Sequence, residues 1–421
     1  MSIIENILWT FIAIPMLFFV SLYFTFIAKF PQFKFKKMIN SLHQDNKNEN
    51  ISPISSLLIA LSARVGVGTL AGTGLAISIG GAGAIFWMWV SAIITSAATF
   101  AENTLAQRFK QIEDKTSFGG PAFYIKEGLG NKKLAALYAL ILIITYTLGF
   151  VAIQMNTLTT VFTENTQATS MIVAVILVLL TGLTITGSIH NVSKFIAKIV
   201  PIIAIFFFGI ALVFLFINIT YIPYFFREIL ESAFGINSVI GGGVGVAITT
   251  GTRRGIFSNE AGLGTGAHAA ALTEHKDPRE QGYIGIIGIY LTTIVSITLV
   301  AFMIMSTSAH LLVMPTGNGI EFLHFALYQL FGITTSFILP VIIFFFGFST
   351  VITAYLYGVM NVKFLTSKKG AILLLRIALL ITVFVASVGD PSAIWSIVDT
   401  GVAITAVINL IALFLLRKYL K

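Results

Sequence analysis

The sequence predicts an all-α membrane protein with about eleven transmembrane helices, and three observations lead to this fold class. Hydrophobic residues make up 57% of the 421 residues and charged residues only 10%, which is too little charge to cover a soluble protein of this length. Apolar runs of about 20 residues, each long enough to cross a hydrocarbon core of ~30 Å, recur along the chain. Two of these runs are interrupted by glycine, at corresponding places in the two halves.

The apolar runs define the order of the predicted helices. No stretch outside them is large enough to form a separate soluble domain, so residues 1–421 are expected to be a single transmembrane domain. The predicted spans are roughly 7–28, 54–80, 84–108, 133–163, 168–187, 194–218, 238–274, 282–306, 334–362, 370–388 and 391–416.

The distribution of Lys and Arg predicts the orientation of the spans. The segment 29–53 carries five lysines and should be cytoplasmic. If the spans alternate from there, the loops on the outside hold only Arg227. This places the N-terminus outside and the C-terminus inside. The first span, 7–28, has no Lys or Arg before it and is interpreted as a retained N-terminal helix rather than a secretory signal.

The remaining ten spans form two groups of five, separated by a polar break around 219–237. The first group covers 54–218 and the second covers 238–417, and each begins with a glycine-interrupted span. Because five is an odd number, the second group must enter the membrane in the opposite sense. The pattern therefore predicts an inverted repeat of five plus five helices, with two broken helices at the centre.

The two glycine-rich segments are the main candidates for a binding site. The first runs from Gly66 to Gly74, and the second from Gly241 to Gly266. A helix that stops and restarts exposes free N–H groups that suit a carboxylate and free carbonyl groups that suit a small cation. An amino-acid zwitterion with a sodium ion would satisfy both. Alternatively, the glycines only allow close packing between helices.

Polar side chains near these segments are further candidates. Ser258 and Asn259 offer contacts beside the freed backbone of the second broken span. Gln154 can donate to a carboxylate or accept from an amino group, or it forms an interhelical hydrogen bond. Ser349 and Thr350 are adjacent hydroxyls that could complete a sodium site, or they bond to their own helix.

Buried charges in the spans suggest gating pairs. Glu260 is costly in a membrane unless it faces a cavity or a partner. Arg64 could pair with Glu102 or Glu260 and lock a gate, or form a structural ion pair. In an outer vestibule, Asp399 could be the partner of Arg253 or Arg254.

Several function classes are disfavoured by the sequence. There is no Walker A motif for ATP, no His-Glu-x-x-His motif, no cysteine and no ladder of arginines. An enzyme is therefore not expected. The net charge of +9 lies mostly in loops on one side of the membrane, so it does not indicate nucleic acid. Nothing in the sequence indicates an oligomer.

Four motifs carry a resemblance to a known family. In order and spacing they are similar to the motifs of the alanine/glycine:cation symporter family, and the resemblance covers essentially the whole chain. They are Ala63-Arg64-Val65-Gly66-Val67-Gly68, Gly80-Gly81-Ala82-Gly83-Ala84-Ile85-Phe86-Trp87-Met88-Trp89-Val90, Gly255-Ile256-Phe257-Ser258-Asn259-Glu260-Ala261-Gly262 and Phe348-Ser349-Thr350.

The resemblance implies a fold like that of the leucine transporter, with ten core helices in two inverted repeats plus one N-terminal helix. It implies sodium-coupled uptake of small neutral amino acids by alternating access. Sodium would contact carbonyl groups near Ser62 and Val65 and the hydroxyls of Ser349 and Thr350. The substrate would lie against Thr69, Leu70, Ala71, Gly72, Gln154 and Phe257.

Two departures from the family pattern bear on the substrate. Members of the family usually carry Asn where this chain has Thr69, and Trp where it has Ala354. Loss of an indole from the pocket wall would leave room for a larger side chain. The expected substrate is therefore of the alanine or glycine class, or a larger one such as glutamine.

The resulting prediction is a sodium-coupled symporter of small neutral amino acids in the cytoplasmic membrane of a prokaryote. Its expected partners are the amino acid, the sodium ion and the lipid bilayer. A proton-coupled amino-acid transporter is the nearer alternative, and a membrane channel or receptor is the alternative from a different class.

Overall fold

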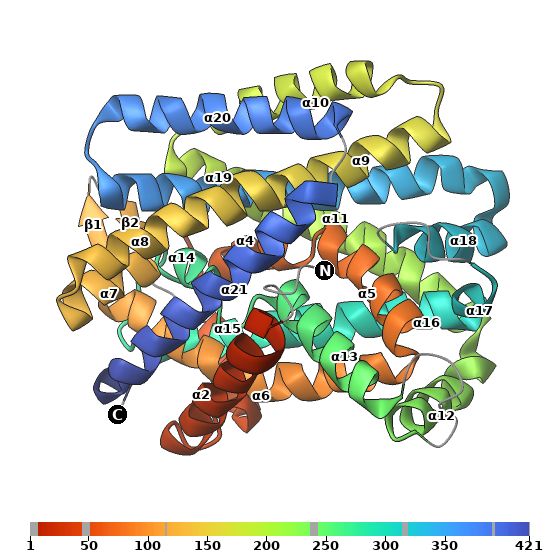
Figure 1. The fold of residues 1–421 in the computed structure, drawn as a ribbon, viewed down its shortest axis with the longest axis horizontal. Helices are drawn as coiled ribbons and strands as arrows, with labels where there is room; N and C mark the ends of the chain where they lie inside the picture. Colours follow the sequence, from red (N-terminus) through yellow and green to blue (C-terminus); the bar gives the residue numbers. More distant parts are fainter. Residues whose placement is uncertain are drawn as a thin grey trace.

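Almost all of the chain is helical in the computed structural model, which describes residues 7–43, 51–113, 116–235, 243–313, 319–389 and 392–420 (Figure 1). Gly241 and Gly242 of the second glycine-rich segment, and both chain ends, lie outside the described residues. One short antiparallel hairpin, β1 (Gln111–Glu113) with β2 (Thr116–Phe118), is an addition that the all-α prediction did not include.

The helices of the first half follow the predicted spans closely. Here η marks a π or 3-10 segment. In chain order they are η1 (Leu8–Ala13), α2 (Ile14–Ile27), η2 (Pro31–Phe33), α3 (Phe35–Leu42), α4 (Pro53–Arg64), α5 (Val67–Gly80), α6 (Gly83–Arg108), α7 (Pro121–Leu129), α8 (Lys132–Leu142), η3 (Ile143–Phe150), α9 (Val151–Asn165), α10 (Ser170–Ile185) and α11 (Ile189–Ile217).

The second half repeats this pattern of long helices with short connections. Its elements are η4 (Ile219–Tyr221), α12 (Ile222–Ala233), α13 (Val244–Asn259), α14 (Gly266–Ala270), α15 (Arg279–Ile289), η5 (Tyr290–Ile297), α16 (Thr298–Ser306), α17 (Ala309–Leu312), α18 (Ile320–Phe331), η6 (Gly332–Thr334), α19 (Thr335–Leu365), α20 (Lys369–Val388), α21 (Ser392–Leu415) and η7 (Arg417–Leu420).

The membrane class of the protein is confirmed by the lengths and apolarity of these helices. Among the described residues, eight helical stretches can cross a membrane, or nine if α4 and α5, which are bent by 49° at their junction, count as one span. Helix α10 is apolar but shorter. The count of eleven spans and the inverted repeat remain predictions.

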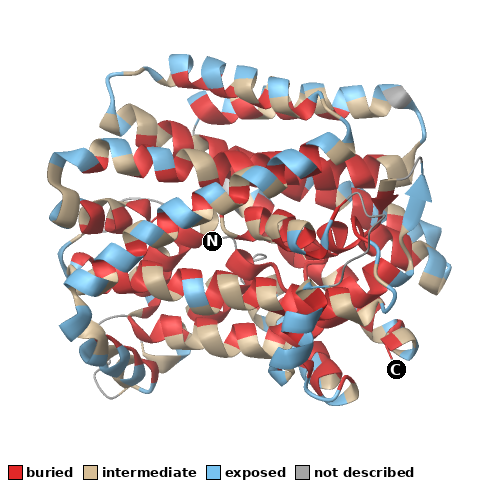
Figure 2. Cartoon of the chain, turned by 180° about the vertical axis from the view of Figure 1, so that it is seen from behind, coloured by how far each residue is buried: buried red, intermediate tan, exposed pale blue. Residues whose placement is uncertain are grey.

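Apolar side chains on the outside of the bundle indicate the surface that faces lipid. In α11 and in α20 only 28% of the residues in the most apolar 18-residue stretch are buried, against 67% in α6. Leu183, Ile205 and Phe216 are each more than 65% exposed, and exposed faces of this kind run along the outer helices in Figure 2. Such continuous apolar exposure is stable in hydrocarbon and unstable in water.

The packing places the two broken helices in the interior. Helices α10 and α20 lie side by side along one edge and pack on α9 (Figure 1). Helix α6 packs against α13, α15 and α2, and α19 packs against α9, α11 and α4. The predicted interruptions are present: one lies between α4 and α5, and the other lies between α13 and α14.

Candidate functional site: two helix breaks

The first break separates α4 from α5 by two residues. Gly66 precedes α5 in an extended conformation (φ −114°, ψ −168°) that any residue can adopt. Space is what requires glycine, because a Cβ atom there would lie 2.6 Å from Thr350 Oγ1 and 3.2 Å from Gln154 Oε1. The absence of a side chain thus lets α9 and α19 approach the backbone of the break.

Gln154 of α9 holds the start of α5. Its Oε1 atom accepts a hydrogen bond of 3.1 Å from the backbone N–H of Val67. Its Nε2 atom is buried and makes no hydrogen bond to any described residue. A buried donor without an acceptor is costly. Since the amino end of a helix carries partial positive charge, Gln154 is well placed to donate to a carboxylate there.

Oxygen atoms of α4 and α19 gather beside the same break. Thr350 Oγ1 lies 2.9 Å from the carbonyl oxygen of Ser62 and 2.8 Å from that of Phe346. Ser349 Oγ lies 3.1 Å from the same Phe346 carbonyl, and Ser62 Oγ lies 2.5 Å from Thr353 Oγ1. The hydroxyls do bond to their own helix, but they also face α4. Hard cations prefer oxygen ligands of this kind.

A cavity of about 70 Å³ adjoins this oxygen cluster. It lies between α4, α11, η5 and α19, and Ser62, Val65 and Ser349 are part of its lining. The other lining residues are almost all apolar. Val65 is therefore placed next to the oxygen atoms with which the sequence grouped it.

The second break begins with a sharp change of backbone direction after α13. Glu260 adopts the left-handed conformation (φ 58°, ψ 19°), and Gly262 and Gly264 both have φ 80°. Glycine adopts this region without strain, whereas a residue with a long side chain rarely does. The contacts of the Glu260 carboxylate, described below, hold the turn in place.

Asn259 stabilises the second break itself. Its Oδ1 atom accepts a hydrogen bond of 3.0 Å from the N–H of Ala261, and its Nδ2 atom donates to Thr293 Oγ1 at 3.1 Å. Both ends of the amide are therefore used within the protein. Ser258, and not Asn259, is the polar side chain that reaches the first break.

Thr69 joins the two breaks. Its hydroxyl donates to the carbonyl oxygen of Arg64 at 2.6 Å and lies 2.7 Å from Ser258 Oγ. At the preceding residue, a Cβ atom at Gly68 would lie 3.3 Å from the ring of Phe257. The hydroxyl of Thr69 thus ties the last turn of α4 to α5 and to the end of α13.

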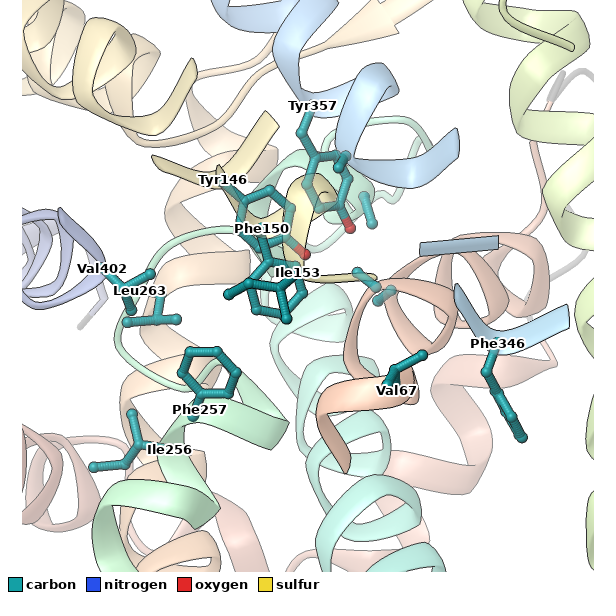
Figure 3. Packing of buried hydrophobic residues seen from close by; sticks show 14 of the residues in the cluster. Val67, Tyr146, Phe150, Ile153, Ile256, Phe257, Leu263, Phe346, Tyr357 and Val402 are labelled. Atoms are coloured by element: carbon teal, nitrogen blue, oxygen red, sulfur yellow. The ribbon is translucent and has the colours of Figure 1, made fainter. Parts of the chain in front are cut away.

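A column of aromatic rings forms one wall beside the breaks (Figure 3). The ring of Phe257 lies 5.3 Å from that of Phe150, which stacks on Tyr146 at 5.0 Å. Tyr146 stacks on Tyr357 at 5.9 Å, and Tyr357 on His268 at 5.1 Å. Tyr146 and Phe150 lie on the π-helical segment η3, a type of distortion that is frequent at functional sites.

The suggested pairing of Arg253 or Arg254 with Asp399 is present for Arg253. Its Nη2 atom lies 2.7 Å from Asp399 Oδ2, and both side chains are only 8% exposed. The indole of Trp9 donates to the Asp399 carbonyl oxygen at 3.0 Å, and Arg253 lies 5.6 Å from the centre of the same indole. The N-terminal helix, α13 and α21 therefore meet at one point, one turn of α13 before Phe257.

The direct pairing of Arg64 with Glu102 or Glu260 that the sequence suggested is not present. Arg64 is 2% exposed, and its three guanidinium nitrogens make no hydrogen bond to any described residue. Gly266 and Gly288 make room for it, because a Cβ atom at either position would collide with the guanidinium. Arg64 is close enough to both carboxylates for electrostatic attraction but is not in contact with them.

The carboxylates of the two acidic residues have other partners. Glu260 Oε1 accepts from the hydroxyl of Tyr146 at 2.5 Å, and its Oε2 accepts from Thr265 Oγ1 at 2.7 Å. Glu102 Oε1 accepts from the N–H of Gly264 at 3.1 Å and from Asn409 Nδ2 at 2.6 Å. Both acidic residues thus hold the second break.

The remaining predicted site residues differ in where they lie. Leu70 and Ala71 are buried in α5, and the Ala71 carbonyl is covered by Gly319 at the start of α18. Gly72 is buried, yet a Cβ atom there would meet nothing within 4 Å, so there is space beside it. Ala354 is fully buried, with its carbonyl oxygen 3.1 Å from Thr147 Oγ1 on η3.

Four residues of the site were not singled out from the sequence. Asn409 and Thr353 are polar residues in apolar spans, the signal that had marked Gln154, and could have been found in the same way. Trp9 and Tyr146 look like ordinary core aromatics in the sequence. Only their hydrogen bonds to Asp399 and Glu260 reveal a further role.

These features define a class of protein. Two interrupted helices meet inside a bundle of apolar spans and present a buried donor, a cluster of oxygen atoms and buried charges, which is the organisation of a secondary transporter. The profile of the sodium:alanine symporter family matches residues 1–421, and the chain belongs to this family.

Individual relatives are similar over nearly the whole chain. The probable sodium/glutamine symporter GlnT of Bacillus subtilis is 36% identical, covering 99% of this chain and 88% of its own. The amino-acid carrier protein AlsT of the same organism is 35% identical, over 95% and 85%. The sodium/alanine symporter AgcS of Methanococcus maripaludis is 34% identical, over 90% and 85%.

Proposed function

We propose that this protein is a sodium-coupled symporter that imports small neutral amino acids by alternating access. The observation that carries the proposal is the pairing of two features at the first break. The Nε2 atom of Gln154 is a buried donor without an acceptor at the start of α5. Oxygen atoms of Ser62, Phe346, Ser349 and Thr350 cluster beside the same Gly66. Together they suit a carboxylate and a cation.

The substrate would lie between the two breaks. Its carboxylate would accept from Gln154, and its side chain would extend into the space beside Gly72 and towards Phe257. Thr69 and Ser258 would bound the opposite side. Sodium would be held by the carbonyl groups near Ser62 and Val65 and by the hydroxyls of Ser349 and Thr350. Since each ligand orders the same break, sodium and amino acid should raise each other's affinity.

The fold proposed for this activity has eleven spans, ten of them in an inverted repeat around the breaks. The helices observed at each predicted span support this arrangement. The protein would lie in the cytoplasmic membrane of a prokaryote, with the N-terminus outside. The ion pair of Arg253 with Asp399 would close the outer path, and the region of Arg64, Glu102 and Glu260 would close the inner one.

The substrates are proposed to include amino acids with side chains larger than that of alanine. One relative is named for glutamine and another for alanine. The space beside Gly72 supports a side chain larger than a methyl group. Competition of unlabelled amino acids against labelled alanine would define the preference.

The test of the function is uptake by purified protein in proteoliposomes. We expect uphill uptake of alanine, glycine or glutamine when sodium is high outside, and none when sodium is equal on both sides. Uptake driven equally well by a proton gradient without sodium would favour a proton-coupled transporter instead. Single-channel currents without saturable uptake would favour a channel.

A further inference from the structure

The two buried carboxyl groups near the second break are bonded in different ways. In Glu260 each oxygen accepts one hydroxyl donor, at 2.5 Å from Tyr146 and 2.7 Å from Thr265. In Glu102 a single oxygen, Oε1, accepts both donors, from Gly264 and Asn409. The other oxygen of Glu102, Oε2, is buried and makes no hydrogen bond to any described residue.

This asymmetry is typical of a neutral carboxylic acid. An ionised carboxylate shares its charge between two oxygens, and each of them accepts hydrogen bonds. A protonated group has one carbonyl oxygen that accepts and one hydroxyl oxygen that carries the proton. Glu102 Oε1 has the surroundings of the carbonyl oxygen. No described residue donates to Oε2, so this is the oxygen left to carry the proton, although its O–H would meet no acceptor among the described residues. The bonding of Glu260 is that of the ionised form.

The charges of the region lead to the same assignment. Arg64 is the one positive side chain that acts on both carboxyl groups, and the region would carry an excess negative charge if both were ionised. Glu102 is fully buried, where an uncompensated charge is strongly disfavoured. With Glu260 ionised and Glu102 protonated, the formal charges of the three groups cancel.

Within the part of the chain that the structure describes, no other neighbour of Glu102 supplies a compensating positive charge. The titratable side chains that act on Glu102 are Arg64 from α4, Glu260 after α13, Tyr124 from α7 and Tyr138 from α8. The Tyr138 hydroxyl donates to the Leu263 carbonyl at 2.7 Å, and that of Tyr124 donates to Asn409. Neither hydroxyl donates to Glu102.

We propose that Glu102 is a proton-binding site of the transporter, with the proton on Oε2, and that this proton is exchanged during transport. The N–H of Gly264, in the second break, is one of the two donors to Glu102. Movement of this break would change the donors around the carboxyl group. On exposure to water on one side of the membrane, the O–H bond at Oε2 breaks and the proton passes to a water molecule, leaving a carboxylate. After the break has moved, the carboxylate takes up a proton from water on the other side, so that each cycle carries a proton across the membrane.

This inference rests on the proposed function, since exchange requires a transport cycle. The protonated state itself is tested first, by infrared spectroscopy of the purified protein at neutral pH. We expect a carbonyl band of a protonated carboxyl group that is sensitive to deuterium and is lost in Glu102→Gln. The band should remain in Glu260→Gln, and also in Glu127→Gln, which alters an exposed carboxylate on α7. A spectrum unchanged by Glu102→Gln would overturn the assignment.

The exchange is tested in proteoliposomes that contain a trapped pH indicator. With wild-type protein, sodium-driven alanine uptake should be accompanied by a change of internal pH. In Glu102→Gln that pH change should be lost, and the pH dependence of uptake should flatten. Glu127→Gln should behave as wild type. Sodium-driven uptake by wild type without any pH change would overturn the exchange and leave the proposed function intact. Absence of sodium-driven uptake in wild type would instead contradict the proposed function.

If Glu102→Gln is not stable, the wild-type protein still tests the proposal. Titration of the infrared band can be followed with and without sodium and alanine. A shift of the midpoint on addition of ligands is expected, because the substrate would lie between the two breaks, and the second break supplies a donor to Glu102. A midpoint that does not respond to ligands would contradict the exchange.

Discussion

The two buried arginines near the helix breaks are stabilised in opposite ways. Arg253 touches its carboxylate at 2.7 Å and lies over the indole of Trp9. Arg64 is more deeply buried and touches no carboxylate among the described residues. The acidic group that balances its charge, Glu260, is instead bonded to the second break. The ion pair of Arg253 and Asp399 can form and separate without other changes. The charge of Arg64, in contrast, is balanced at a distance, so its stability depends on the conformation of the second break.

Substitution of Arg64 should have the largest effect. Replacement by Gln leaves the buried Glu260 carboxylate without a positive charge, which should cost about 3–5 kcal/mol of stability. We expect a lower Tm and loss of sodium-driven uptake. The double variant Arg64→Gln with Glu260→Gln should recover part of the Tm, because it removes the unbalanced charge. An unchanged Tm in the single variant would show that Arg64 does not stabilise Glu260.

Loss of the ion pair between Arg253 and Asp399, called the outer pair below, should destabilise the protein less than loss of Arg64. Its main effect should be to make the space between the breaks more accessible from outside. Asp399→Asn removes the charge that holds Arg253, at a cost of roughly 2–4 kcal/mol. The chain has no cysteine, so labelling of a single Ser258→Cys by an impermeant thiol reagent reports opening of the outer path. We expect labelling to be faster by roughly tenfold or more.

The matched controls for the outer pair come from the same surface. The exchange of Arg253→Asp with Asp399→Arg should restore slow labelling. Glu228→Gln alters an outer carboxylate that bonds to His310 instead of Arg253, and it should leave labelling slow. Fast labelling in Glu228→Gln would mean that the reporter does not measure the pair.

The oxygen cluster at the first break carries no formal charge, and its loss should mainly affect the binding of sodium. Thr350→Val removes a hydroxyl that lies 2.9 Å from the Ser62 carbonyl. Since a hydrogen bond or contact to a charged group contributes about 1.5–3 kcal/mol, sodium affinity should fall roughly tenfold to a hundredfold. Uptake measured against sodium concentration checks this. Thr350→Ser keeps the hydroxyl and should change affinity far less; an equal loss would argue against a sodium contact.

Substitution of Trp9 in the N-terminal helix should have the smallest effect. Trp9→Phe removes one hydrogen bond to the Asp399 carbonyl but keeps an aromatic ring beside Arg253, at a cost of about 1 kcal/mol. Labelling at Ser258→Cys should rise only several-fold, and less than in Asp399→Asn. Trp9→Leu, which loses the ring as well, should lie between the two. If Trp9→Phe, Trp9→Leu and Asp399→Asn are all labelled at the same rate, the Trp9 hydrogen bond is as important for closure as the ion pair of Arg253 with Asp399.

The breaks themselves were predictable from the sequence, because their cause is local. Glycine at Gly262 and Gly264 allows positive φ whatever the rest of the chain does, whereas Gly66 is required by side chains of other helices. The polar residues of the site were also marked, since Gln154, Ser349 and Thr350 stand out in apolar spans. Which of them meet was less certain. Ser258 was found to reach Thr69, whereas the amide of Asn259 is used within its own break.

The sequence could not predict which buried arginine contacts which carboxylate. Pairing of Asp399 with Arg253 or Arg254, and of Arg64 with Glu102 or Glu260, were both open suggestions, yet only Arg253 and Asp399 are in contact. The positions of Gly266 and Gly288 decide where the guanidinium of Arg64 fits, and neither glycine is near Arg64 in sequence.

The sequence by itself determined the membrane class, the positions of the spans and the two breaks. These depend on hydropathy and on glycine, which act over a few neighbouring residues. The tertiary structure alone decided the partners: Trp9 with Asp399, Val67 with Gln154, and Glu102 with Asn409. Such contacts join residues that are far apart in the chain. Their distances and directions follow from how whole helices pack, and no short segment of sequence contains that information.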